Sequence, residues 1–121
     1  MYRQGDVLLV AVRPETASGI KPGRDLREAN TKRVVLAYGE VTGHAHVVLS
    51  GKETGRQKGR VEFFEAKEGL DAQGAAQILR VTGRAAELRH DEHKTIVLPR
   101  GTYRVIRQRE YSPEAIRQVA D

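Results

Sequence analysis

The stretch LRHDEHKTIVLPRGTYRV, residues 88–105, indicates the fold most directly. Short runs rich in Val, Ile and Leu are separated by the polar pair Asp91-Glu92 and by Pro-Arg-Gly at 99–101. Short apolar runs bounded by turn residues are typical of β-strands. We therefore predict strands at 85–90, 93–98 and 102–110, joined by short turns.

The same pattern extends through the rest of the chain. Further strands are predicted at 6–13, 33–38, 41–49, 60–66 and 76–82, with a tight turn at 81–84 and a polar hairpin tip at 51–59. The long connection 14–32 is predicted to contain a helical turn at 25–29, and a connection of that length is typical of a lid or a disordered segment. The whole chain, 1–121, is thus predicted to be a single mainly β domain.

The C-terminal segment SPEAIRQVAD differs from the rest. Ser112 is a favoured N-cap, and Pro113 suits the first helical position. We therefore expect a short C-terminal helix at 113–119 beside a small β-barrel or sandwich.

Composition limits the compartment and the partners. The chain has no cysteine, which excludes disulfides and thiolate metal sites and makes a reducing cytoplasm the expected compartment. No apolar run approaches the roughly 20 residues of a membrane span, so no membrane role is expected. The net charge of +5 favours anionic small molecules or nucleic acid, bound by electrostatics. Exposed strand edges in so small a domain lead us to expect a homo-oligomer.

All four histidines occur as two tight pairs. His44 and His46 are two residues apart, so on a strand they project to one face. His90 and His93 share a face only if the two residues between them form a hairpin turn, which would place their Cβ atoms about 4.5–5.5 Å apart. We predict that the two pairs face each other across the interior of the barrel.

The same alternation of side chains along a strand predicts the faces of the residues that flank His90 and His93. Leu88 and His90 should share a face, and His93, Thr95 and Val97 should continue it on the returning strand.

Three or four imidazoles together suit a divalent transition metal, with Zn²⁺ first and Ni, Cu, Fe or Mn as alternatives. Three ligands would leave a position for water and permit hydrolysis, whereas four would make a closed structural or storage site. Glu40, Asp91 and Glu92 are candidates to orient the imidazoles. Two alternatives remain open: each pair is an ordinary surface or turn feature, or the histidines act as acid and base without metal.

Two segments resemble cupin motifs. GEVTGHAH resembles the first motif, with its His-x-His, and HKTIVLPRGTYRV resembles the second, in which Pro-x-Gly follows a strand. The resemblance implies a cupin-like barrel with His44 and His46 as metal ligands. The chain departs from the cupin pattern because Ser50 and Gly51 stand where the motif has a glutamate, and Arg104 stands where it has its last histidine.

The whole chain also resembles a group of small uncharacterised bacterial proteins. The shared motifs are QGDVLL, GEVTGHAH, His-x-x-His and LPxGxYxVxxQREYxPE. This resemblance carries no activity, but it places the histidines and the QREYSPE segment in one functional unit.

The arginines near the C-terminus have two interpretations. Arg104 and Arg109 could bind an anionic substrate near the metal, or they could pair with carboxylates of neighbouring strands. The sequence therefore predicts a metal-binding protein, with metal-dependent hydrolysis of a phosphoester as the first chemistry considered. The alternative is a non-enzymatic binding or assembly module with a structural or intersubunit histidine site, and the sequence leaves open whether the protein is an enzyme.

Overall fold

The computed structural model describes residues 1–30, 33–38, 44–50, 60–67 and 76–107. In chain order, the strands are β1 (Tyr2–Gln4), β2 (Val7–Val12), β3 (Pro22–Asp25), β4 (Val34–Tyr38), β5 (Ala45–Leu49), β6 (Arg60–Ala66), β7 (Gln77–Thr82), β8 (Ala86–His90), β9 (His93–Leu98) and β10 (Gly101–Arg107). A short helix, α1 (Pro14–Ala17), lies between β2 and β3. Within these residues, no helix is long and apolar enough to cross a membrane.

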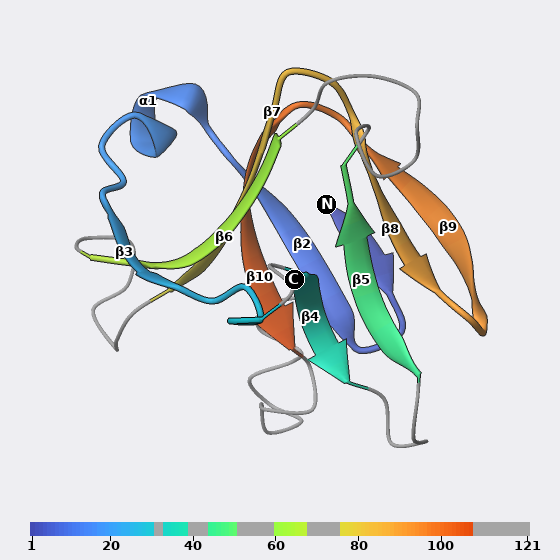
Figure 1. The fold of residues 1–121 in the computed structure, drawn as a ribbon. Coiled ribbons are helices and arrows are strands. Elements are labelled where there is room, and N and C mark those ends of the chain that lie inside the picture. The colour runs from blue at the N-terminus through green and yellow to red at the C-terminus, as the bar shows by residue number, and fades with distance from the viewer. Residues whose placement is uncertain (31–32, 39–43, 51–59, 68–75, 108–121) are drawn as a thin grey trace, which may run out of the picture.

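The strands form two antiparallel sheets (Figure 1). Sheet A has six strands in the order β1–β2–β10–β7–β6–β3, and sheet B has four in the order β4–β5–β8–β9. The main hydrophobic core draws on both sheets, for example Leu9 and Leu79 of sheet A with Leu36 and Leu88 of sheet B. A smaller apolar cluster around Ile78 and Phe64 covers the outer face of sheet A. The protein is therefore a small β-sandwich rather than a closed barrel in the part of the chain that is described.

Each predicted strand is confirmed within the described residues, whereas the predicted strand ends at 41–43 and 108–110 lie outside them. The errors in placing strands and helices fall in the N-terminal third. The short strands β1 and β3 and the helix α1 were not predicted. The helical turn predicted at 25–29 is wrong, because its backbone N–H groups bond elsewhere. Leu26 donates to the carbonyl of Phe63 at 2.8 Å, and Glu28 donates to that of Arg33 at 3.0 Å. The predicted hairpin tip at 51–59 and helix at 113–119 lie outside the described residues.

The hairpin of β8 and β9 turns at Asp91-Glu92, as predicted, with His90 opposite His93. Its register then shifts, so that Leu88 pairs with Ile96 rather than with Thr95. The extra residue in β9 leaves Thr95 exposed and brings Ile96 and Leu98 to the face of His93. The predicted face containing Thr95 and Val97 is therefore wrong, because period-two arithmetic does not allow for a β-bulge.

Candidate metal centre

Three histidines form a row across sheet B. His90 and His93 are register partners in β8 and β9, and His46 of β5 continues the register in which Val47 faces Arg89. The ring centroids of His46 and His90 are 4.3 Å apart, and those of His90 and His93 are 4.7 Å apart. The three side chains can each offer one nitrogen, and these atoms lie within 4.8 Å of one another. The predicted placement across a barrel is wrong, because the histidines are neighbours within one sheet.

Local sequence explains why this row faces the interior. In β5, buried His46 and Val48 alternate with half-buried neighbours, and in β8 buried Leu88 and half-buried His90 lie on either side of exposed Arg89. The row therefore extends the inner face of sheet B beyond its apolar core. His46 is only 3% exposed, whereas His93 is exposed, so the triad runs from the interior to the surface.

The N-terminal hairpin packs over this row. Gln4 of β1 is 2% exposed, and its side-chain nitrogen donates to the carbonyls of Leu88 at 3.0 Å and Lys94 at 2.9 Å. Its Oε1 atom therefore faces His46 Nδ1, at 2.9 Å. Because an amide oxygen can only accept, His46 Nδ1 must carry the proton. The Nε2 lone pair of a neutral His46 is thus free to bind a metal.

Gly5 and Asp6 form the two-residue turn between β1 and β2. Gly5 has a φ of +57°, in the left-handed region that favours glycine. A Cβ atom at this position would lie 2.9 Å from His93 Nε2 and 3.1 Å from His46 Cε1. Glycine is therefore required here both by the backbone conformation and by the space that the histidines occupy.

Asp6 places a carboxylate against the buried histidine. Its Oδ1 lies 3.3 Å from His46 Nε2. Burial lowers the pKa of His46, and so does the charge of His90, although Asp6 acts in the opposite direction. A neutral His46 with its proton on Nδ1 presents a lone pair to the Asp6 oxygen. Two facing acceptors repel each other, and a cation between them removes the repulsion.

His90 would have to adjust in order to bind a metal. Its Nδ1 accepts a hydrogen bond from the backbone N–H of Glu92 at 3.1 Å, which places the ring proton on Nε2 in the neutral form. Coordination of a neutral imidazole through Nε2 requires that proton to move to Nδ1, with loss of the Glu92 hydrogen bond. The Glu92 N–H that would lose this bond lies in an exposed two-residue turn, where water can replace the ring nitrogen as its acceptor.

His44 does not join the triad. Its ring centroid is 5.9 Å from that of His90, and its Nδ1 lies 3.2 Å from Glu92 Oε1. The Asp91 carboxylate is farther away, with Oδ2 at 4.0 Å from His44 Nε2. The two acidic residues predicted to orient the imidazoles thus contact His44 at the rim, while Glu92 reaches the triad through its backbone N–H.

Arg104 is not brought to the histidines. It lies on β10 between Val10 and Ile78, whereas its neighbours Tyr103 and Val105 belong to the core between the sheets. Since successive residues of a strand project to opposite faces, Arg104 projects from the outer face of sheet A. Two further predicted residues, Glu40 and Arg109, lie outside the described residues.

Gln4, Gly5 and Asp6 were not predicted as site residues, although they lie beside the triad. A signal was present, because Gly-Asp is a typical pair for a two-residue hairpin turn and an apolar run follows it at 7–12. That signal predicts the turn, but it does not predict which strands the turn packs against.

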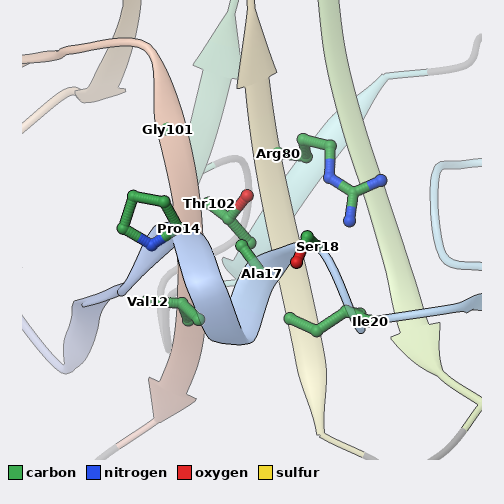
Figure 2. Close-up of a pocket in the computed structure, with 8 residues that line it drawn as sticks. All are labelled: Val12, Pro14, Ala17, Ser18, Ile20, Arg80, Gly101 and Thr102. Carbon is green, nitrogen blue, oxygen red and sulfur yellow. The ribbon is translucent and has the colours of Figure 1, made fainter.

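A hollow lies on the outer face of sheet A, beside α1 (Figure 2). Its volume is about 420 Å³, and its lining residues include Val12, Ile20, Thr102 and Arg80. The Arg80 guanidinium lies 5.2 Å from the centroid of the Phe64 ring. The hollow is separate from the histidines, which lie on the inner face of the opposite sheet.

The fold and the site together define a small antiparallel β-sandwich with a histidine triad at one end of its interior. The chain belongs to a family described as a domain of unknown function, DUF8820, which matches residues 3–108. Searches of the curated proteins and of the solved structures find no match. The expected membership of an uncharacterised family is thus supported, whereas the cupin resemblance is not confirmed.

Proposed function

We propose that this protein binds one divalent transition-metal ion through His46, His90 and His93. The observation that carries the proposal is the 3.3 Å approach of Asp6 Oδ1 to His46 Nε2, on a ring whose other nitrogen must donate to Gln4. Burial lowers the pKa of His46 although Asp6 acts in the opposite direction, and a positive ion between the ring nitrogen and the carboxylate would satisfy both acceptors. A charge-assisted N–H···O bond would also be shorter, at about 2.7–2.9 Å.

The donor set favours a borderline metal. Imidazole nitrogens suit Zn, Cu, Fe and Ni, whereas Mg²⁺ and Ca²⁺ prefer oxygen ligands. Zn²⁺ is our first choice because it is commonly bound by three or four His, Cys or carboxylate ligands in tetrahedral geometry. Gln4 supports this role, because a hydrogen bond to the second ring nitrogen is the usual way in which a protein orients a metal-binding histidine.

Hydrolysis of a phosphoester has less support than metal binding itself. Among the described residues, the carboxylates of Asp6, Asp91 and Glu92 lie within 4.0 Å of histidine nitrogens. Carboxylates at this distance disfavour an anionic substrate. The arginine considered as a substrate clamp, Arg104, projects from the outer face of the other sheet. We therefore propose that the site serves to hold the metal.

Calorimetric titration of metal-free, untagged protein with Zn²⁺ tests the proposal. We expect one ion per chain. Loss of a residue that only hydrogen-bonds to a metal ligand typically weakens metal affinity by roughly 10- to 100-fold, and we expect His46→Ala and His93→Ala each to weaken it by more than that. His44→Ala is the matched control, since it removes a histidine from the same segment but outside the triad, and it should change affinity by only a few fold. Equal affinity in all four proteins would contradict the proposal.

A further inference from the structure

We propose that Asp6 is the fourth ligand of the metal, so that the ion is coordinated by both sheets and cross-links the sandwich. This inference rests on the proposed function, because it concerns the ion that the histidine triad holds. Asp6 lies in the turn between two strands of sheet A, whereas His46, His90 and His93 belong to sheet B.

The distance between Asp6 and His46 fits two ligands of one tetrahedral ion. Zn²⁺ binds nitrogen and carboxylate oxygen at about 2.0–2.1 Å, which places two tetrahedral ligand atoms about 3.3–3.4 Å apart. The observed separation of His46 Nε2 and Asp6 Oδ1 is 3.3 Å. Octahedral ligands at the same bond length would lie closer, at about 2.9 Å. The geometry therefore matches adjacent corners of a tetrahedron.

The surrounding residues fix the position of Asp6. On one side, Gln4 is anchored by hydrogen bonds to the backbone of β8 and β9. Gly5 then turns the chain with a left-handed φ, so close to the rings of His46 and His93 that a Cβ atom there would meet both. On the other side, Val7 is fully buried in the core. The Asp6 carboxylate is therefore held beside His46 by the backbone on both sides.

A fourth protein ligand changes what the site can do. Three histidines and one carboxylate saturate a tetrahedral ion, which leaves no position for an activated water. The ion then connects the β1–β2 turn to β5, β8 and β9, segments that are far apart in the sequence. In a chain without cysteine, this connection performs the cross-linking that a disulfide performs elsewhere.

Cobalt substitution tests the inference, because Co²⁺ reports its coordination number through visible absorption. Wild type, Asp6→Ala and Asp6→Asn are loaded with Co²⁺, and Asp91→Asn is the control because its carboxylate contacts His44 rather than the triad. We expect wild type and Asp91→Asn to give the intense spectrum of a tetrahedral site, unchanged between pH 6.5 and 8. We expect Asp6→Ala to bind Co²⁺ at least about tenfold more weakly.

The pH dependence of the spectrum separates a ligand from a merely structural residue. In Asp6→Ala, water takes the fourth position, and metal-bound water ionises near pH 7, so this variant should acquire a spectral titration. The inference is overturned if wild type itself shows that titration, or if Asp6→Ala keeps the wild-type spectrum and affinity. Absence of Co²⁺ and Zn²⁺ binding in wild type would instead contradict the proposed function, so the two failures are distinguishable.

Discussion

Replacing Gly5 by alanine should damage the metal site through a single added carbon. The backbone cost comes first: a non-glycine residue in the left-handed region costs about 1–2 kcal/mol. Gly83, in the turn between β7 and β8, has a φ of +78° and lies at the opposite end of β8 from His90. Gly83→Ala should therefore incur the same backbone cost without touching the histidines, which makes it the matched control.

The second cost is specific to Gly5. The new Cβ would lie 2.9 Å from His93 Nε2, whereas non-bonded heavy atoms are ordinarily about 3.5–4.0 Å apart. His93 must therefore move by about 0.6 Å or more, which exceeds the roughly 0.2 Å tolerance of metal–ligand distances. We expect zinc affinity to fall at least about tenfold in Gly5→Ala, which is comparable with the loss of a hydrogen bond that orients a metal ligand.

Urea unfolding of the metal-free proteins and calorimetric zinc titration separate the two costs. Both variants should lose about 1–2 kcal/mol of stability, and only Gly5→Ala should lose zinc affinity. If Gly5→Ala binds zinc as tightly as Gly83→Ala does, the turn at Gly5 does not pack against the metal ligands.

Three further predictions concern the same structure. Gln4→Leu leaves the carbonyls of Leu88 and Lys94 without their side-chain donor. Urea unfolding should show a loss of stability of about 2–6 kcal/mol, reduced by the gain from burying the apolar leucine. Wild-type stability in this variant would contradict the importance of the Gln4 hydrogen bonds. Burial lowers the pKa of His46, so its contribution to stability is complete above its unfolded pKa of about 6.5 and is lost as the pH falls below that value. Urea unfolding of metal-free protein between pH 5 and 7.5 should show this loss in wild type and less of it in His46→Ala. Any binding of duplex DNA should be electrostatic, given the net charge of +5. The logarithm of the association constant should then fall by about 0.9 per phosphate contact for each tenfold rise in salt concentration. A complex whose affinity does not depend on salt would contradict this expectation.

Strand positions were predictable because strand patterning is local. Residues near His90 show this clearly, since the apolar runs and the two polar residues between His90 and His93 determine the hairpin without reference to the rest of the chain. The register shift in β9 was not predictable, because the bulge depends on which residues of β8 and β9 pack inward together. Thr95 and Val97 were therefore assigned to the wrong face.

The histidines of the site were predictable from the sequence, but the residues that position them were not. Pairing of the histidines along the chain indicated a shared site, and three of the four do lie together. Gln4 and Asp6 could not be assigned from pattern alone, because their role depends on sheet A packing its first turn against sheet B. His44 matches the motif as well as His46 does, but it precedes the strand, and its ring contacts Glu92 instead of the triad.

Zinc-edge X-ray absorption of untagged, zinc-loaded protein identifies the ligands of the metal, because multiple scattering from imidazole rings counts the histidine ligands. We expect one zinc per chain with three imidazoles at about 2.0–2.1 Å. We also expect one imidazole to be lost in His93→Ala and none in His44→Ala. A spectrum with one imidazole or none in wild type, or one that loses an imidazole only when His44 is replaced, would contradict the claim that His46, His90 and His93 hold the metal.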